Sequence, residues 1–466
     1  MLIRFFINYI ALIFSFVILP QSAQSQDSIQ IPFSNPKSFL INDLKSYKVS
    51  VSFSTVNSVN KYIAFYSLTK STHLKNKISN LVNVGDSLCL NTKICFIGND
   101  SIFEINGLRA NNTYWIYVIS VKDTSGYYVF STLNALEIKV TTPSGDCNNY
   151  YDEIIPSAPN FIQVLSEKIN PHNVISYSNY KNSLLEQYEK HDTLNGKKFV
   201  VCAYSGDIVV YDPPFDWNKL GLSREHTFAH SWMPSYPANS SAKPEYSDLH
   251  NLYVTNLEKA NSVRSNHPFG EVTDSLIFSF KEGKLGYNGS KIVYEPRDLH
   301  KGNVARAIFY MSVAYNGIQS LSWKIPAYQD QEVLKKWHFE DLPDNYEIAR
   351  HEFIYNIQGN RNPFIDSIQF ACFIDFSKLL SNKNRCENLQ IDELPFLKTS
   401  LIQCDNNWLF VDSKINNLSI TDLTGKTVFT LDDNDVNQID ISSLTSGFYL
   451  LRFQIDGVPQ SQMFMK

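Results

Sequence analysis

The sequence lacks the short patterns that most often assign a function. It has no glycine-rich phosphate loop and no dinucleotide-binding fingerprint, which argues against the common nucleotide-binding enzymes. No cysteine pair has the C-x2-C spacing of a structural zinc site. After the first twenty or so residues, no apolar run reaches the roughly 18 residues of a membrane-spanning helix, so we expect no membrane span in the mature chain.

Positive charge is scarce as well. The formal net charge is −5 at pH 7, whereas domains that bind nucleic acid usually carry a basic face. An enzyme that acts on nucleic acid needs only a local basic groove. The charge therefore lowers the expected affinity for such a substrate without excluding it.

The cysteines are few and odd in number, so at least one thiol stays unpaired in a monomer. The seven positions are Cys89, Cys95, Cys147, Cys202, Cys372, Cys386 and Cys404. An exported protein can form disulfides, and Cys89 with Cys95 could close a short loop. None lies beside the polar motifs described below, so we interpret all seven as structural or inert.

The first 25 residues have the pattern of a secretory signal peptide. Arg4 provides a positive start, an apolar run extends from residue 10 to residue 19, and Pro20 ends it. Ala23-Gln24-Ser25 fits a cleavage site with small residues. The pattern predicts an exported, soluble protein; a retained anchor is the alternative.

A length of 466 residues is too great for one ordinary domain, and the pattern changes twice along the chain. Residues 27–145 alternate apolar and polar positions in short runs, which predicts an antiparallel β-sandwich. Residues 150–390 mix helical and strand patterns, which predicts an α+β domain. Residues 398–466 return to short strands separated by turn signals.

Two helices are expected in the middle of the chain. Asn303 is the predicted cap of the first, whose apolar stripe runs from Val304 to Tyr315 and which ends at Asn316-Gly317. The second is expected to start at Asp344 and to stop at Gly359.

Three polar motifs lie close together within the middle region, before the two predicted helices. They are Ser223-Arg224-Glu225-His226, Asp248-Leu-His250-Asn-Leu252 and Asn261-Ser-Val-Arg264-Ser-Asn266. A histidine can take a proton from water, carboxylate and amide oxygens can hold a hard divalent cation, and guanidinium groups match phosphate. Together these are the groups needed to cut a phosphodiester bond.

These motifs resemble the bacterial endonuclease I family of secreted His-Me finger nucleases. The resemblance extends in the same order to residues 264–271, 303–311 and 357–366. Ser223 and Ala229 depart from the family pattern, which has Asn and Pro there. The resemblance implies a metal-dependent endonuclease that hydrolyses DNA, and RNA as an open alternative, with low sequence specificity and 5′-phosphate products.

The resemblance also implies roles for single residues. His226 matches the general base, and Glu225 with Asn261 match the metal ligands, which suit Mg²⁺, Mn²⁺ or Ca²⁺. Arg264 and Arg224 are candidates for binding phosphate, and a structural salt bridge is the alternative for each. A role in substrate binding or in supporting the site is expected for His250, Trp232, Asn266, Gln358, Asn360 and Arg361.

One point of geometry is unresolved in the sequence. Neighbouring residues on a regular strand face opposite sides, so Glu225 and His226 cannot both face one site from an ideal strand. Either the strand ends at His226 or a bulge turns one of them. Asn261 follows His226 by 35 residues. That interval leaves room for a loop, a second strand from Asp248 and a helix starting at Leu257, the order of the family's ββα-metal fold.

The flanking regions have resemblances of their own. Residues 108–126 resemble the corner before the penultimate strand of a fibronectin type III module. Residues 439–449, with the chain ending at Lys466, resemble the C-terminal sorting domain of type 9 secretion substrates; an accessory binding sandwich is the alternative. This resemblance implies a protein that is exported through the periplasm and then secreted or held at the outer cell surface.

We therefore expect a multidomain protein with a His-Me finger nuclease core between two β-sandwiches, acting as a monomer and recognised by the type 9 secretion machinery. The competing hypothesis is a cell-surface adhesion or carbohydrate-binding protein with an inactive nuclease-like scaffold. The presence of Glu225, His226 and Asn261 together favours the enzyme.

Overall fold

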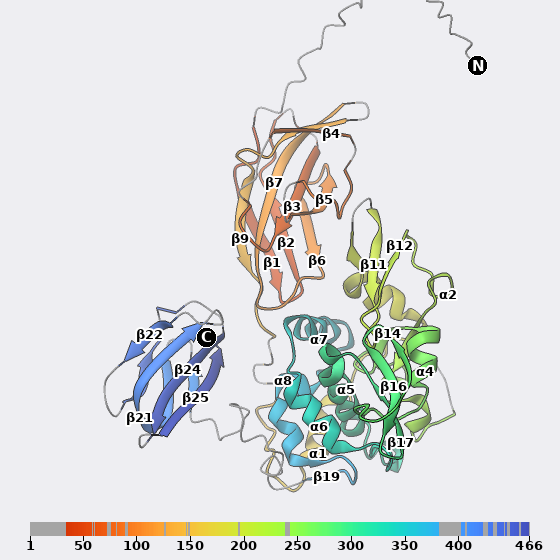
Figure 1. Cartoon of the computed structure of the whole chain (residues 1–466). Helices are drawn as coiled ribbons and strands as arrows, with labels where there is room; N and C mark the ends of the chain where they lie inside the picture. The colour runs from red at the N-terminus through yellow and green to blue at the C-terminus, as the bar shows by residue number, and fades with distance from the viewer. Residues whose placement is uncertain are drawn as a thin grey trace, which may run out of the picture.

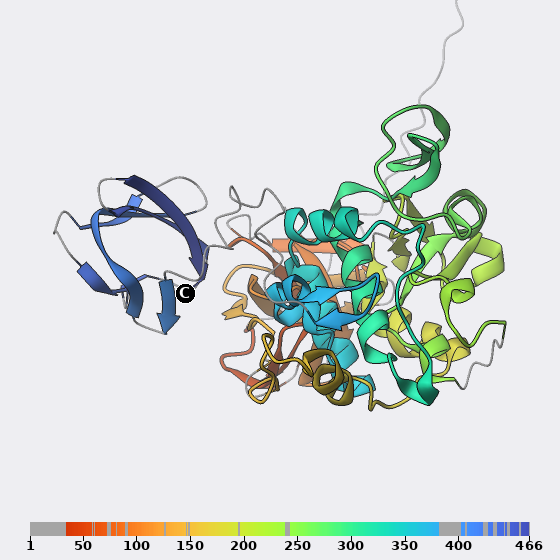
Figure 2. The same cartoon turned by 90° about the horizontal axis from the view of Figure 1, so that it is seen from below.

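The computed structural model describes residues 34–381 and 402–465, with short breaks chiefly at 72–75, 238–242, 423–426, 432–435 and 445–447. The predicted signal peptide and the 390–398 boundary lie outside the described residues. Figures 1 and 2 show strands at both ends of the described chain and a mixed middle part, with the C-terminal strands as a lobe apart from the rest.

The N-terminal part consists of antiparallel strands in two sheets, one ordered β1-β2-β6 and the other β4-β8-β7-β3-β5, with β9 also pairing β7. The strands are β1 (Phe39–Lys45), β2 (Lys48–Phe53), β3 (Lys61–Ser67), β4 (Asn76–Asn80), β5 (Lys93–Gly98), β6 (Ile102–Asn106), β7 (Thr113–Thr124), β8 (Tyr127–Ser131) and β9 (Leu136–Thr141). Val49 and Val51 of one sheet share a core with Ile116 and Val118 of the other. The alternating pattern buries every second residue between the sheets.

The middle part mixes strands with a group of helices (Figure 1). The strands are β10 (His191–Asp192), β11 (Lys198–Val201), β12 (Ile208–Tyr211), β13 (Leu222–His226), β14 (Leu252–Asn256), β15 (Leu276–Phe280), β16 (Gly283–Asn288), β17 (Lys291–Glu295), β18 (Ile374–Asp375) and β19 (Leu380–Ser381). The longer helices are α1 (Phe161–Ile169), η2 (Lys181–Glu189), α5 (Lys301–Ala314), α6 (Gln331–Glu340) and α7 (Asn345–Gln358). The shorter ones are η1 (Tyr177–Asn179), α2 (Trp217–Leu220), η4 (His230–Trp232), α3 (Pro244–Ser247), η5 (Leu257–Asn261), α4 (Ser262–Arg264), η6 (Asp298–His300), η7 (Ile318–Ser320), α8 (Pro363–Asp366) and η8 (Ile368–Phe373). Helix α5 is buried along most of its length and forms the centre of the core.

The predicted helix ends are confirmed for α7 and wrong for the start of α5. Asp344 caps α7 by accepting bonds from the backbone N–H groups of residues 346 and 347, and Gly359 ends it with a φ of 87°. Helix α5 begins at Lys301, so Asn303 lies within it. The reason is that η6 already turns the backbone before Lys301 and leads directly into the helix.

The second strand begins later than predicted. Residues 248–251 form a turn, with the Asn251 N–H donating to the Asp248 carbonyl at 3.1 Å, and β14 starts at Leu252. The Asp248 carboxylate holds this turn by accepting the His250 N–H at 3.0 Å. The helix predicted from Leu257 is confirmed as η5.

The C-terminal part contains only strands among its described residues. They are β20 (Ile402–Asp405), β21 (Trp408–Asp422), β22 (Thr427–Leu431), β23 (Val436–Asp440), β24 (Phe448–Ile455) and β25 (Val458–Met465). Short strands are present among the described residues of this region, as predicted. Leu418, Ile420 and Leu451 belong to its apolar core.

The predicted Cys89–Cys95 loop closure is wrong, because Cys95 is a free thiol packed beside the apolar core of the N-terminal part. Cys147 and Cys202 are also free, whereas Cys372 is disulfide-bonded. Cys202 is buried and accepts the Asn256 N–H, so its role is structural.

The N-terminal and middle parts share an interface. Tyr47 packs edge-on against Phe353 of α7 at 5.2 Å between ring centroids. The Ala110 N–H donates to the Asn345 carbonyl at 3.0 Å, at the start of the same helix. Tyr47 and Ala110 belong to an apolar cluster made mostly of middle-part residues, so the N-terminal part is packed against the middle part (Figure 1).

Candidate active site

The three polar motifs meet at an antiparallel pair of strands and the helical turn that follows. Glu225 of β13 lies opposite Tyr253 of β14, and His226 lies opposite Leu252. The pairing has no bulge and β13 ends at His226, so the first of the two predicted geometries is confirmed. The order of strand, strand and helix is the one predicted.

His226 has a defined tautomer. Its Nε2 lies 2.7 Å from the Tyr246 carbonyl oxygen, which can only accept, so Nε2 carries the hydrogen and Nδ1 keeps a lone pair. The side chain is 7% exposed, and burial lowers its pKa to about 4. The imidazole is therefore neutral at neutral pH and able to accept a proton at Nδ1.

An ordered stack of side chains positions this imidazole. The Tyr177 ring lies parallel to the His226 ring, with 5.2 Å between centroids and 5° between planes. The Arg224 guanidinium lies over the same tyrosine at 4.2 Å and over Trp217 at 4.8 Å. Arg224 and His226 are two residues apart on β13 and so lie on one face of the strand. Tyr177, Tyr246 and Trp217 were not predicted as part of this site, because no motif includes them.

Glu225 lies on the other face, and its carboxylate is also buried. Its Oε1 accepts a bond from Arg264 Nη1 at 3.1 Å, and the side chain is 7% exposed. Burial raises its pKa to about 7, against the opposing effect of the Arg264 charge. One arginine thus offsets the desolvation of this carboxylate only in part, and a second cation beside it would favour the ionised form.

Arg264 is enclosed by protein. The residue is 1% exposed, and its guanidinium also donates to the carbonyls of residues 226, 227 and 265. It stacks on Trp232 at 4.9 Å and on Phe269 at 4.5 Å. Binding a phosphate would break these contacts, so the geometry does not support the predicted phosphate role. Arg264 instead links the end of β13 to the helix that follows β14.

Asn261 ends η5, three residues before Arg264, and is half-buried. Because Arg264 ties this helix to Glu225, the turn that carries Asn261 lies against β13. No hydrogen bond joins the Asn261 amide to another residue in the described ranges. A buried carboxylate and an unengaged amide oxygen are hard donors, and they fit a divalent cation.

His250, Gln358 and Asn360 form a buried polar network behind the site. His250 bonds the Asn360 carbonyl through Nε2 at 3.2 Å and is too buried to contact substrate. Gln358 donates to Asp248 at 2.9 Å and accepts the Leu249 N–H at 3.0 Å. Asn360 donates to the Ile169 carbonyl at 2.7 Å. The network holds the turn before β14.

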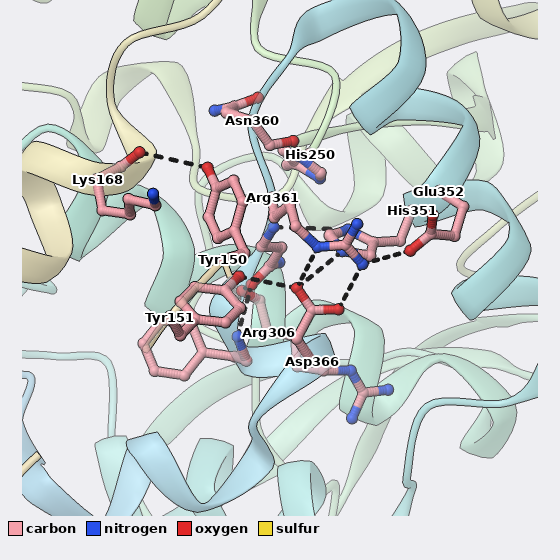
Figure 3. Close-up of polar contacts among 12 residues, drawn as sticks. Tyr150, Tyr151, Lys168, His250, Arg306, His351, Glu352, Asn360, Arg361 and Asp366 are labelled. Atoms are coloured by element: carbon pink, nitrogen blue, oxygen red, sulfur yellow. Dashed lines mark hydrogen bonds and ion pairs between the residues drawn. The ribbon is translucent and has the colours of Figure 1, made fainter. Parts of the chain in front are cut away.

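Arg361 serves the fold and not the chemistry. Figure 3 shows its guanidinium between the carboxylates of Asp366 and Glu352. Two of its nitrogens donate to Asp366 at 2.8 Å each, and His351 lies 3.2 Å from the same carboxylate. His351, Glu352 and Asp366 are close enough together to suggest a metal site. Arg361 already supplies the positive charge there, so we interpret the group as an ion-pair lock.

The remaining predicted residues differ in accessibility. Asn266 is exposed in the loop after α4, where it can reach a substrate. Trp232 is buried and packs edge-on against Phe228 as well as against Arg264. A residue that the motif analysis did not single out, Asn251, accepts the Phe228 N–H at 2.7 Å and donates to its carbonyl at 3.2 Å. It fixes the chain just after His226.

Comparison with known proteins identifies the family of this chain. The endonuclease I family matches residues 159–369, and the secretion system C-terminal sorting domain matches residues 399–465. An extracellular ribonuclease of Bacillus amyloliquefaciens is 31% identical over 248 residues, which covers 50% of this chain and 80% of that protein. This chain belongs to the endonuclease I family.

Other similar proteins are also nucleases. An endonuclease-1 of Buchnera aphidicola subsp. Baizongia pistaciae is 31% identical over 26% of this chain and 46% of that protein. An extracellular deoxyribonuclease of Aeromonas hydrophila is 30% identical over 26% of this chain and 49% of that protein. The endonuclease described here is a secreted enzyme that carries a type 9 sorting domain.

Family membership has two further consequences. The substrate is nucleic acid, and endonuclease I enzymes generally depend on a divalent metal ion.

No helix among the described residues is long and apolar enough to cross a membrane. Among solved structures, a human fibronectin type III domain aligns with 27% of this chain and 96% of its own length, at 18% identity and a TM-score of 0.18, too low to assign a fold.

Proposed function

We propose that this endonuclease hydrolyses DNA, and RNA as a second substrate, with His226 as the general base. The supporting observation is the tautomer of His226, whose Nε2 is held by the Tyr246 carbonyl and whose Nδ1 is left to accept a proton from the attacking water. The relatives include both ribonucleases and deoxyribonucleases, which supports activity on both nucleic acids.

Glu225 and Asn261 are the proposed ligands of a divalent cation, with Mg²⁺ first and Mn²⁺ or Ca²⁺ as substitutes. When bound, such a cation stabilises charge on the pentacoordinate phosphorus and on the leaving 3′ oxygen. Arg264 orients Glu225 and joins it to the helix of Asn261. Its buried position supports a positioning role.

Arg224 is the proposed phosphate contact. It is half-buried, and contacts with the Tyr177 ring at 4.2 Å and the Trp217 ring at 4.8 Å restrict the direction of its guanidinium. A fixed guanidinium binds phosphate oxygens at a smaller loss of conformational entropy. Contacts mainly to phosphates predict weak sequence preference and binding that weakens with salt. The products would carry 5′-phosphates and 3′-hydroxyls.

The finer architecture belongs to the same proposal. We propose a His-Me finger core within residues 150–390, a fibronectin type III-like sandwich at 27–145, a sorting sandwich at 398–466, and a monomer after removal of residues 1–25. Tyr114 supports the second assignment, because its hydroxyl accepts the Arg109 N–H at 2.9 Å as in the tyrosine corner of such sandwiches.

A metal titration of the cleavage rate tests the proposed ligands. Glu225→Gln and Asn261→Ala are expected to raise the Mg²⁺ concentration for half-maximal activity at least tenfold. Lys259→Ala is the matched control, because Lys259 is exposed on the same helix and offers no oxygen ligand. Unchanged metal dependence in both variants would contradict the assignment.

A further inference from the structure

A cavity of about 240 Å³ lies where the N-terminal and middle parts meet. Its walls come from the loop after β6, the strands β11 and β14, the start of α5 and helix α7. None of the residues predicted for the active site lines it. The volume is below the roughly 300 Å³ at which pockets for drug-sized ligands begin, so a small ligand fits best.

The charges around this cavity are unbalanced. Three arginines line it, Arg109, Arg297 and Arg350, against the two carboxylates Glu189 and Asp344. Both carboxylates are already engaged. Glu189 accepts from Arg350 at 2.8 Å and from the Tyr180 hydroxyl at 2.6 Å, while Asp344 caps α7.

Two of the arginines are available to bind an anionic ligand. Neither Arg109 nor Arg297 has an ion-pair partner in the described part of the chain. Arg109 is exposed, and Arg297 uses its Nε to donate to the Ala203 carbonyl at 3.0 Å. With three arginines and two carboxylates, the lining of the cavity carries an excess of positive charge.

Helix α5 begins beside the cavity. Its N-cap residue His300 and its first-turn residue Asn303 line the cavity, and the Asp341 carboxylate already accepts the Gly302 N–H of this helix end at 2.8 Å. His300 is 3% exposed, and its Nε2 bonds no described residue. Burial, followed by the charges of Arg297 and Arg350, lowers the His300 pKa, as expected for a site with excess positive charge.

We propose that this cavity is a second anion site that binds a phosphate group between Arg109 and Arg297. Guanidinium groups match phosphate oxygens in geometry and charge. Arg109 belongs to the N-terminal part and Arg297 to the middle part, so the bound anion joins the two parts. The phosphate would be free inorganic phosphate or the 5′-phosphate of a nucleotide, and only the second source rests on the proposed function.

Isothermal titration calorimetry of the full mature chain in EDTA tests this site. The probes are inorganic phosphate and deoxyadenosine 5′-monophosphate, and the parent is expected to bind one of them. Arg109→Met/Arg297→Met is expected to bind at least tenfold more weakly. Arg109→Met alone should also weaken binding, and its exposed position keeps folding intact.

Lys122→Met/Lys219→Met is the matched control, since it removes one exposed cation from each part away from the cavity. Binding of phosphate itself supports free phosphate as the ligand, and binding of the nucleotide alone supports the 5′-phosphate. No binding of either probe, or equal binding by parent and arginine variants, would overturn the site. Plasmid cleavage measured in parallel keeps this result separate from the nuclease assignment.

Discussion

At the scale of single residues, the position of His226 depends on an aromatic side chain from far along the sequence. The Tyr177 ring contacts both the Arg224 guanidinium and the His226 imidazole, and its hydroxyl donates a hydrogen bond to the Arg224 carbonyl at 3.1 Å. It can therefore fix both the imidazole and the guanidinium without touching the reacting atoms. Substituting Tyr177 therefore changes the position of the catalytic histidine while leaving its chemical groups unchanged.

Tyr177→Leu is expected to lower kcat by about tenfold to a hundredfold, because small displacements of a catalytic group cost that much. Tyr177→Phe keeps the ring and should retain most activity. Steady-state kinetics on a defined duplex checks both variants. Equal kcat in the leucine variant and the parent would show that the stack does not position the base.

A second residue-scale prediction concerns acid stability. His338 donates through Nε2 to the Ile368 carbonyl at 2.8 Å, and burial with the nearby Arg306 charge lowers its pKa to about 3. An unfolded histidine titrates near 6.5, so between about pH 3 and 6.5 the unfolded state binds more protons and stability falls as pH falls. This histidine should contribute a slope of about 1.4 kcal/mol per pH unit in that window.

His338→Gln should therefore flatten the pH dependence of the free energy of unfolding below pH 6.5. Urea denaturation between pH 4.5 and pH 7 measures it. His250, which is buried with a pKa of about 3, stays in place in both proteins and cancels in the comparison. Parallel curves for parent and variant would contradict the buried neutral state of His338.

The sequence predicts part of the site at this scale and misses the rest for physical reasons. Glu225, His226 and Asn261 are predicted because their motifs match the endonuclease I family, and their order fits two strands followed by a helix. Tyr177 is not visible, since its contact with His226 depends on how η1 packs against β13. The burial of Arg264 is likewise a tertiary property, and arginine is ordinarily a surface residue.

At the scale of elements, the turn from α7 to α8 is held by charge. Arg361 is buried against Asp366 and Glu352, and the Tyr151 hydroxyl donates to Asp366 at 2.8 Å. His351, Glu352 and Asp366 are close enough to hold a metal ion, but Arg361 already pairs with both carboxylates. A bound metal and an ion-pair lock make different predictions.

Asp366→Asn should destabilise the protein by about 3 kcal/mol, because it leaves a buried arginine with less compensation. Because a cation is also proposed at Glu225 and Asn261, any change of melting temperature caused by EDTA should be the same in the parent and in Asp366→Asn. Asp298→Asn is the control, since Asp298 pairs with Lys301 while 87% exposed and should have little effect. A fall in melting temperature on adding EDTA that Asp366→Asn abolishes would favour a metal at this place.

Helix ends illustrate what local sequence can and cannot predict. Asp344 and Gly359 bound α7 as expected, because a capping carboxylate and a left-handed glycine act within one turn. Asn303 is an equally good capping residue by type. It is not a cap because η6 sets the helical course before Lys301, and that turn depends on packing of His300 against Tyr204 and Tyr253.

At the scale of the whole molecule, the N-terminal part is more than a spacer. Tyr47 and Ala110 join an apolar cluster with residues of η2 and α7, and the backbone bond from Ala110 to Asn345 reinforces the contact. The sequence predicted two domains here but not their packing. The contact uses only a few loop residues, and these carry no periodic signal.

Tyr47→Ala should remove roughly 3 kcal/mol from this interface, the loss typical of a large buried side chain. Differential scanning calorimetry of the mature chain should show the N-terminal and middle parts unfolding together in the parent and separately in the variant. Tyr127→Ala is the control, because Tyr127 is 48% exposed on the N-terminal part. Separate unfolding already in the parent would contradict a stabilising interface.

The central claim is that His226 activates water in a metal-dependent endonuclease. The most direct measurement is nicking of supercoiled plasmid by the full mature chain with Mg²⁺, with EDTA, and by a folded His226→Ala variant. We predict rapid nicking by the parent with Mg²⁺, none with EDTA, and a rate at least a hundredfold lower in the variant. Nicking by the variant at the parental rate would contradict the account.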